Sequence, residues 1–598
     1  MSHTSVLLGF ITGTCTIIPQ QKNFVNTFFK NSFLFFSFCE FSLQNDRKYV
    51  IILSVLDRSL LGEALMTHKH FFKSSLIPCL LLSALAGALT GILIFLFKIS
   101  ASAVISLSRE IYSFVRENLI YLPLLLLGIS GIAILAAIIL KKAPTCRGGG
   151  IPTTIAILRG LIPFQWIHST FYLFASALLT YLGGVPLGNE GPSVQMGTAV
   201  GRGTVRLFSK KDSALDPFVM TGGASAGFAA ATGAPLSGIV FAFEETHRRF
   251  SPMMFISIVT AVLTSQISMR TLCFVFGISP SLFEISISTV LPLKYLWSTL
   301  LVGTMCALFA VLFTKFYRIV FEFSKAQAKK LPLWSKFVAV FVLVALIGVI
   351  SVDFLGTGHD LTEEMLHEGG VWYWILLCLL IRAILLILAN NVGVTGGLFV
   401  PYLCFGAMIG ALSAKILIAL DLFPSEYYII LVITGMAAFL SAASRTPLTA
   451  LLFSVEVLCA LTNLLPIAVG VLVSYLIIEL LHVQDLSDTV IQTKVEKIHQ
   501  GKKATVVEAA LCVEEHSFIV GKEISEILWP PTCVVLSITK KDRHLLEIAP
   551  GDVIHLHYQT YNNEETLRHL EAIVGHQSVA PELILHRQEK NDVIPDVE

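Results

Sequence analysis

The chain alternates between long apolar runs and short polar connections over most of its length. Four of the runs contain no charged residue: 76–97, 121–140, 295–314 and 337–352. At 1.5 Å per residue in a helix, each is long enough to cross or nearly cross a hydrocarbon core of ~30 Å. Other apolar segments are shorter or interrupted by glycine, which predicts helices that end inside the bilayer. The pattern therefore predicts a polytopic, helical membrane region.

Composition agrees with this pattern. The 598 residues are 55% hydrophobic and 14% charged, with a mean hydropathy of +0.76, whereas a soluble domain carries about 25% charged residues. The formal net charge of +1 gives no electrostatic basis for nucleic-acid binding. The 11 cysteines are scattered without a Cys-x-x-Cys pair, so neither disulfides nor metal ligands are expected. Lys and Arg pairs in the connections place the C-terminus in the cytoplasm, and we expect a bacterial inner membrane.

Residues 1–65 carry the weakest pattern. The apolar segment 6–15 has no Lys or Arg before it and no small-residue cleavage site after it, unlike a secretory signal. The aromatic segment 28–41 contains Lys30 and Glu40. Two interpretations stay open: an interfacial segment, or an extension without a function that precedes a start at Met66, which we favour.

After about residue 500 the composition changes to that of a small soluble domain. Residues 504–508, 534–539 and 552–558 are predicted strands, 523–528 a short helix and 549–552 a turn. The predicted division is an N-terminal extension (1–65), a transmembrane region (66–492), a cytoplasmic α+β domain (500–575) and a tail (576–598).

An internal repeat divides the transmembrane region into halves of about 75–270 and 285–490. The segment 229–244 aligns with 441–456, with Pro-Leu and Phe-x-x-Glu in one register, so that Glu244 corresponds to Glu456. Shared helix composition does not produce both coincidences. Two homologous halves predict a transport site at their interface, near the midplane of the bilayer.

One acidic residue, Glu190, interrupts some of the most apolar sequence of the chain. A carboxylate at bilayer depth costs roughly 2.5 to 3.5 kcal/mol on insertion scales, so it indicates a function. Gly188 and Gly191 break the preceding helix, and Pro192 suits the first turn of the next one. A helix that begins there aims free N–H groups and its positive dipole end at an anion. The stretch therefore predicts an anion site in which Glu190 competes with the anion.

Three further stretches carry candidate site residues. Glycine breaks precede predicted helix starts at 148–152 (Gly-Gly-Gly-Ile-Pro) and at 396–401 (Gly-Gly-Leu-Phe-Val-Pro). Glycine lets the backbone approach a ligand closely, and a helix start offers free N–H donors. The third stretch is the acidic pair 244–245, which ends another apolar segment.

Taken in chain order, these four stretches resemble the motifs of the CLC family of chloride channels and proton-coupled chloride antiporters, over about 75–490. The motifs are Gly-x-Gly-Ile-Pro, Gly-x-Glu-Gly-Pro, Glu-Glu and Gly-Gly-x-Phe-x-Pro. The resemblance implies an all-α polytopic membrane fold with two inverted-topology repeats and broken helices, in a homodimer with one pathway per subunit. It implies that Glu190 is the gating residue, whose carboxylate occupies the anion's place when ionised and swings away when protonated. It implies that Glu245 is the inner proton-transfer residue. The anion-binding residues that it implies are Gly149, Gly150, Ile151, Gly188, Glu190, Gly191, Leu398 and Phe399.

Three positions depart from the family. Gly149 replaces the anion-coordinating serine, and Asn189 stands where arginine is usual. Ser487 lies closest to the position of an expected tyrosine, so it is a candidate inner gate. Loss of the serine and tyrosine weakens proton coupling or changes selectivity. Gly149 with Asn189 resembles the fluoride-exporting branch, whereas Glu245 and Pro192 argue against that branch.

The C-terminal domain resembles the TrkA-C ligand-binding subdomain of potassium-conductance regulators, through 508–511, 521–525 and 549–554. The resemblance implies a small-molecule ligand; a stabilising appendage of the dimer is the alternative that we favour. His555 and His557 share one strand face without a third ligand, so no metal is expected.

The leading prediction is chloride/proton antiport gated by Glu190, with Glu245 as the inner proton relay. A passive voltage- or proton-gated chloride channel and a fluoride-selective antiporter of the same fold stay open. For Glu245 itself, a solvated acid that faces Arg248 and Arg249 is the alternative. A cation transporter would need a carbonyl-lined filter such as Thr-Val-Gly-Tyr-Gly, which the sequence lacks. No His-Glu-x-x-His motif is present and no Gly-x-Ser-x-Gly motif accompanies a base, so neither an enzyme nor a cofactor is expected, only the transported ions.

Overall fold

The computed structural model describes residues 76–575 with short gaps. The gaps are 149, 209–212, 249, 281, 284, 286–288, 328–330, 368, 500–503, 516, 525–526, 531, 541–546 and 562. The expectations for residues 1–65 and for the tail 576–598 lie outside the described residues.

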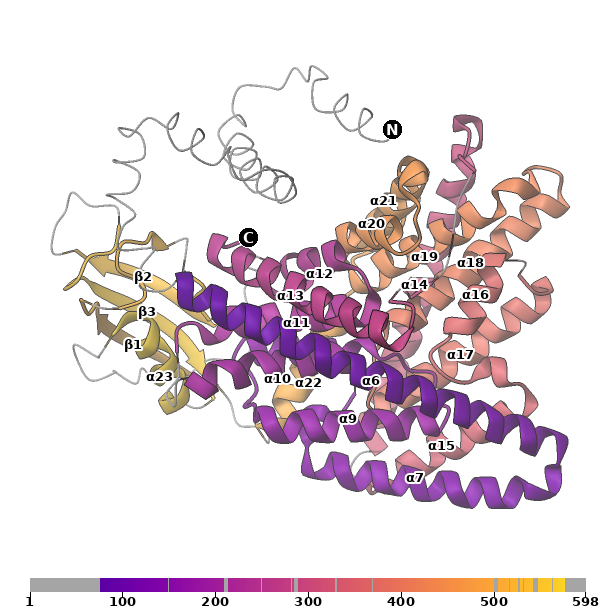
Figure 1. The fold of residues 1–598 in the computed structure, drawn as a ribbon, viewed down its shortest axis with the longest axis horizontal. Coiled ribbons are helices and arrows are strands. Elements are labelled where there is room, and N and C mark those ends of the chain that lie inside the picture. The colour runs from indigo at the N-terminus through magenta and orange to yellow at the C-terminus, as the bar shows by residue number, and fades with distance from the viewer. Residues whose placement is uncertain are drawn as a thin grey trace. The chain divides into compact units, whose positions relative to one another are not determined.

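The first half of the membrane region is a series of helices of very unequal length, drawn from indigo to magenta in Figure 1. They are α6 (Ile77–Glu117), α7 (Leu122–Lys142), α8 (Gly150–Leu158), α9 (Trp166–Leu182), α10 (Glu190–Phe208), α11 (Asp216–Thr232), α12 (Pro235–Phe241) and α13 (Pro252–Phe276). Three of them, α6, α7 and α13, are long and apolar enough to span a membrane, and the shorter α8 to α12 lie between α7 and α13, as the glycine interruptions predict.

The second half repeats this mixture of long and short helices. Its helices are α14 (Leu296–Gln327), α15 (Leu333–Ile350), α16 (His359–His367), α17 (Trp372–Val392), α18 (Phe399–Ala419), α19 (Tyr428–Ser444), α20 (Pro447–Glu456) and α21 (Leu464–Leu480), and α22 (Leu486–Ile498) follows. Over the described part of the chain, nine helical segments are long and apolar enough to cross a membrane, by length and composition. Large apolar side chains cover their outer faces, such as Leu127 on α7 (72% exposed) and Phe274 on α13 (88%). Lipid is the solvent that such surfaces require, so the chain is an integral multi-pass membrane protein.

The predicted repeat appears as two equivalent helix corners. The chain turns at Gly233 between α11 and α12 (φ 74°) and at Arg445 between α19 and α20 (φ 57°), so both helices end in a left-handed residue. Pro235 and Pro447 then begin the short helices α12 and α20. The same local solution therefore occurs at the same place in each half.

Each half also stabilises a helix of the other half through one carboxylate. Glu456, the last residue of α20, accepts hydrogen bonds from the backbone N–H groups of residues 236–237 in α12, at 2.6 and 2.8 Å. Glu244 accepts the equivalent bonds from residues 448–449 in α20, both at 2.8 Å. Each carboxylate therefore satisfies free N–H groups and the positive end of a helix. The alignment of Glu244 with Glu456 thus corresponds to a reciprocal contact between the halves.

Glycines set the closest helix crossings, also in equivalent places. A Cβ on Gly197 of α10 would lie 2.1 Å from the carbonyl oxygen of Gly223 on α11, and one on Gly406 of α18 would lie 2.3 Å from that of Gly435 on α19. The glycines of the Gly87-to-Gly91 spacing in α6 serve the same kind of packing, because a Cβ on Gly87 would meet the backbone of α13 at 2.1 Å. Small residues replace the hydrophobic driving force that helices lack in lipid.

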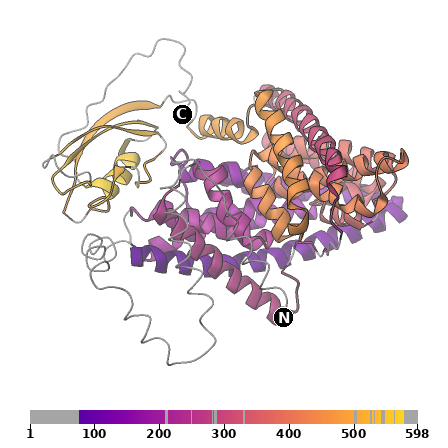
Figure 2. The same cartoon turned by 90° about the horizontal axis from the view of Figure 1, so that it is seen from above.

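The C-terminal domain is a three-stranded antiparallel sheet with one helix. Its elements are β1 (Thr505–Cys512), β2 (Cys533–Thr539), β3 (Val553–Thr560) and α23 (Asn563–Val574), with strand order β1-β3-β2. Figures 1 and 2 show α23 against one face of the sheet. Alternate residues such as Leu511, Ile554 and Leu556 are fully buried, which gives the period of two from which strands were predicted.

The three predicted strands and the turn at 549–552 are confirmed; in the turn, the Asp552 N–H donates to the Ala549 carbonyl at 3.1 Å. The helix α23 was not predicted. The short helix predicted over 523–528 falls partly on the undescribed residues 525–526.

Candidate functional site

Three helices, α8, α10 and α18, begin close to one point inside the membrane region. The loops before α10 and α18 join through a two-residue antiparallel bridge: the Gly188 N–H donates to the Gly397 carbonyl at 2.8 Å, and the Gly397 N–H donates back at 2.6 Å. The Tyr181 hydroxyl also donates to the Gly188 carbonyl, at 3.0 Å. The loop before α8 is held by a bond from the Gly148 N–H to the Gly393 carbonyl at 3.0 Å. These bonds position three helix starts together.

Glycine is required where these loops touch. A Cβ on Gly150 would lie 1.9 Å from the carbonyl oxygen of Gly191, and a Cβ on Gly191 would lie 2.9 Å from the Cα of Gly397. Any side chain would separate the loops. Gly149, a predicted anion-binding residue, lies outside the described residues, between Gly148 and Gly150.

Glu190 is the first residue of α10, and its side chain is 0% exposed. The carboxylate packs on Gly188, where a Cβ would lie 2.4 Å from Oε2. Neither carboxylate oxygen forms a hydrogen bond within the described part of the chain. The backbone N–H groups of Glu190 and Val400, at the starts of α10 and α18, lie near the carboxylate but outside hydrogen-bond geometry. Glu190 therefore occupies a place suited to an anion without being fixed there by a hydrogen bond.

A buried lysine adds positive charge near this carboxylate. Lys98 lies on α6, and its ammonium nitrogen is inaccessible to solvent and has no hydrogen-bond partner among the residues described. It interacts electrostatically with Glu190. Sequence reasoning missed this residue, although it directly follows the apolar run 76–97 and is therefore a charge at the end of a membrane segment.

A cavity of about 50 Å³ reaches the bridge at Gly397. It is lined by several predicted site residues from three helix starts and from the end of the membrane region. They are Gly150, Ile151, Leu398, Phe399, Glu245 and Ser487. The structure thus brings together residues that are separated by more than half of the chain. Gly188, Glu190 and Gly191 lie beside this cavity, in contact with its lining residues Gly150 and Gly397.

Glu245 faces the cavity from the π-helical turn Ala242–His247 that follows α12. A π-turn is a common local distortion at functional sites. The side chain is 8% exposed, which differs from the solvated acid considered as its alternative. Arg248 forms its ion pair with Asp485 at 3.3 Å. Arg248 and Asp485 thus place opposite charges near Glu245.

Ser487 is the second residue of α22 and lines the same cavity. Its backbone N–H donates to Asp485 Oδ1 at 2.8 Å, so Asp485 caps the helix that carries it. Its hydroxyl is one side-chain donor in the cavity lining, at the position that the sequence named as a candidate gate.

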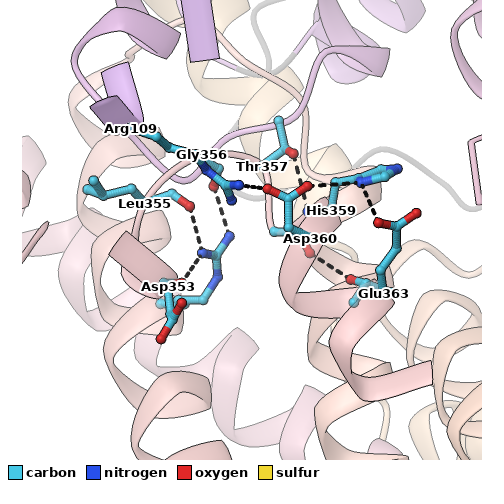
Figure 3. Close-up of polar contacts among 11 residues, drawn as sticks. Arg109, Asp353, Leu355, Gly356, Thr357, His359, Asp360 and Glu363 are labelled. Carbon is cyan, nitrogen blue, oxygen red and sulfur yellow. Dashed lines mark hydrogen bonds and ion pairs between the residues drawn. The ribbon is translucent and has the colours of Figure 1, made fainter. Parts of the chain in front are cut away.

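A separate polar cluster lies on α16 and is shown in Figure 3. His359, Asp360 and Glu363 place one ligand atom each within 4.8 Å of one another. Asp360 forms an ion pair with Arg109, and the fully buried Arg382 donates to three nearby backbone carbonyls. A cation at Asp360 would compete with the Arg109 guanidinium, so the surrounding charge opposes metal binding.

Comparisons with known proteins point to one family. The family model described as voltage gated chloride channel matches residues 131–479. The fold is similar to that of a slow cyanobacterial Cl−/H+ antiporter (TM-score 0.62, 24% identity, covering 70% of this chain and 98% of that one). It is also similar to a eukaryotic CLC transporter, with a TM-score of 0.57 and 19% identity, covering 70% of this chain and 74% of that one. A third similar structure is a CLC-type fluoride/proton antiporter, with a TM-score of 0.56 and 19% identity, covering 67% of this chain and 95% of that one.

Proposed function

Because the chain belongs to the voltage-gated chloride channel (CLC) family, whose members are transporters or channels, we propose that it exchanges chloride for protons across the membrane. One observation carries the proposal: the Glu190 carboxylate, completely buried and without a hydrogen bond, lies where helix starts meet. The cyanobacterial Cl−/H+ antiporter of similar fold supports it.

The anion step follows from the helix starts. Free N–H groups and the positive ends of α8, α10 and α18 attract one negative charge. When Glu190 is ionised, its carboxylate provides that charge and excludes chloride. Protonation removes the charge, so the side chain leaves and chloride takes its place. Lys98 adds a positive charge from α6 that interacts with Glu190. Proton binding and chloride binding are thus linked at one position.

The proton step needs an acid on the inner side, and Glu245 is the candidate. It is nearly buried and faces the cavity that reaches Gly397 and Phe399. An acid in such a place exchanges protons with solvent on one side and with the cavity on the other. We assign to Glu245 the transfer of protons between the cytoplasm and Glu190, and to Ser487 a place at the inner gate.

Assembly and localisation form part of the proposal. By its resemblance to the family, the chain would form a homodimer in which each subunit holds its own pathway. The C-terminal domain would lie in the cytoplasm, at a bacterial inner membrane. Its TrkA-C-like motifs favour a small-molecule ligand or a stabilising role in the dimer.

Fluoride/proton antiport is the second candidate. Gly149 removes the serine hydroxyl from the anion site, and Asn189 accompanies this change. The fold similarity to a CLC-type fluoride/proton antiporter agrees with such a function, whereas the buried Glu245 favours the chloride antiporter.

The test is flux into proteoliposomes that carry a chloride or fluoride gradient, with anion and proton movement recorded together. For the wild type, we expect a chloride gradient to drive proton uptake. Glu190→Ala should retain chloride flux and lose proton movement. Chloride flux without proton movement in the wild type would show a channel, and a strong preference for fluoride would show the second candidate. Absence of any anion flux from folded protein would contradict both.

A further inference from the structure

The inner end of the anion site has few side-chain donors. Gly149 has no side chain, and Ser487 offers one short hydroxyl at the inner edge of the cavity. A small anion that has lost its water needs donors from every side.

Most other polar side chains of the lining are engaged within the protein: Ser444 bonds to Thr446, and Thr449 donates to Glu244. The amide nitrogen of Asn390 has no partner among the described residues and is one free donor. Further free donors of the lining are therefore candidates for binding the anion.

Tyr402 is placed to supply such a donor. It lies three residues after Phe399 on α18, so the two side chains share one face of the helix. Both line the cavity, together with Glu245. The residue is 5% exposed, and the cavity lies against it.

The ring of Tyr402 is held in a fixed orientation. It packs edge to face against Phe313, with centroids 5.9 Å apart and planes at 89°, and against Phe439, at 5.7 Å and 73°. Such contacts prefer a definite geometry. The hydroxyl is thus presented from a rigid support, as a binding group requires.

Other buried tyrosines use their hydroxyls to hold the fold. Tyr317, which lines the same cavity, donates to Asn390 Oδ1 at 2.7 Å. Tyr112 donates to the Gly183 carbonyl at 3.0 Å, and Tyr181 donates to the Gly188 carbonyl at the same distance. The Tyr402 hydroxyl makes no hydrogen bond with the parts of the chain that the structure describes. Its oxygen is not among the fully buried polar atoms that lack a partner, so the hydroxyl is open to the cavity that Tyr402 lines and is available to a ligand.

We propose that the Tyr402 hydroxyl donates a hydrogen bond to the anion at the inner end of the site. It thereby adds a donor from α18 to the hydroxyl of Ser487, in a site where Gly149 has no side chain. The ligand class is a small monovalent anion, with chloride as the leading case. The proposal rests on the proposed function, because it assigns a residue to the same anion site.

The experiment is calorimetric titration of chloride into the purified full chain in detergent, for the wild type, Tyr402→Phe and Tyr317→Phe. The first substitution removes only the free hydroxyl. We expect it to weaken chloride binding about tenfold, since a hydrogen bond to a charged group is among the stronger ones. Tyr317→Phe is the comparison variant from the same cavity: its hydroxyl already bonds to Asn390, so its removal should weaken chloride binding far less than Tyr402→Phe does.

Three results would overturn the assignment. They are unchanged chloride affinity in folded Tyr402→Phe, an equal loss of affinity in Tyr402→Phe and Tyr317→Phe, and wild-type affinity in Tyr402→Leu, whose side chain has no donor. If the wild type neither binds nor transports an anion, the proposed function fails instead. Chloride transport by the wild type with unchanged binding in Tyr402→Phe would retain the function and reject the role of Tyr402.

Discussion

The two halves of the membrane region share a scaffold and differ in chemistry. Glu190 and Phe399 are the first residues of α10 and α18, and each lies two positions before a proline. Glu245 and Val457 each follow the glutamate that caps a helix of the other half. Both ionisable residues of the proposed pathway thus lie in the first half, and their counterparts are apolar. The comparison indicates that both halves supply helix starts, whereas the proposed proton chemistry would belong to the first half alone.

The equivalence of the two halves is tested most severely where glycines allow two helices to cross closely. Gly197→Val in the first half and Gly406→Val in the second should each prevent recovery of folded protein, because the new side chains would meet backbone atoms that cannot move away. Such overpacking costs about 3 kcal/mol. The measurement is the fraction of monodisperse protein after extraction into detergent. Gly128→Val on α7 is the control, since a Cβ there meets nothing within 4 Å. A normal yield from only one crossing variant would contradict the equivalence.

The reciprocal caps should show a smaller and equal effect. Glu244→Gln and Glu456→Gln each place an amide NH2 against backbone N–H donors of the other half. We expect each to lower the free energy of unfolding by about 2 kcal/mol, the cost of an unsatisfied buried group. Thermal unfolding in detergent measures the loss, with the exposed Glu426 as the control for glutamine substitution. If one cap proved dispensable, the two halves would not stabilise each other symmetrically.

The smallest effect is expected at the two helix corners. Gly233→Ala introduces a Cβ at a left-handed position, which costs about 1 kcal/mol. Arg445→Gly relieves the same strain but loses the ion pair with Glu479 at 3.1 Å. The net change in the free energy of unfolding should therefore be close to zero. The same unfolding assay would therefore separate the substitutions, and an equal loss in both would show that the corners are not equivalent.

Much of the scaffold was predictable because it depends on local sequence. The charge-free runs 76–97 and 121–140 became parts of α6 and α7, and the glycine breaks preceded helix starts as predicted. Periodicity did not give the length of α6, which continues to Glu117 well beyond its apolar run. Its later residues Ala101, Ser108 and Tyr112 are buried against neighbours that sequence alone does not identify.

The contacts of the site depend on distant parts of the chain and were therefore harder to predict. The repeat matched Glu244 with Glu456, yet nothing in the alignment indicated that each carboxylate caps the helix of the opposite half. Tyr402 was not noticed, because one tyrosine in an apolar helix is indistinguishable from a core residue until its hydroxyl is seen to have no partner. Lys98 was missed for a similar reason, as the end of a membrane run is a common place for lysine.

The most direct measurement is proton uptake driven by a chloride gradient in proteoliposomes that contain Glu190→Gln, Glu245→Gln, Phe399→Leu or Val457→Ala. We expect chloride to move in all four variants. Proton movement should stop in Glu190→Gln and Glu245→Gln and should persist in the two second-half variants. Proton movement that survives in both glutamine variants, or that is lost equally in all four, would contradict the assignment of proton chemistry to the first half.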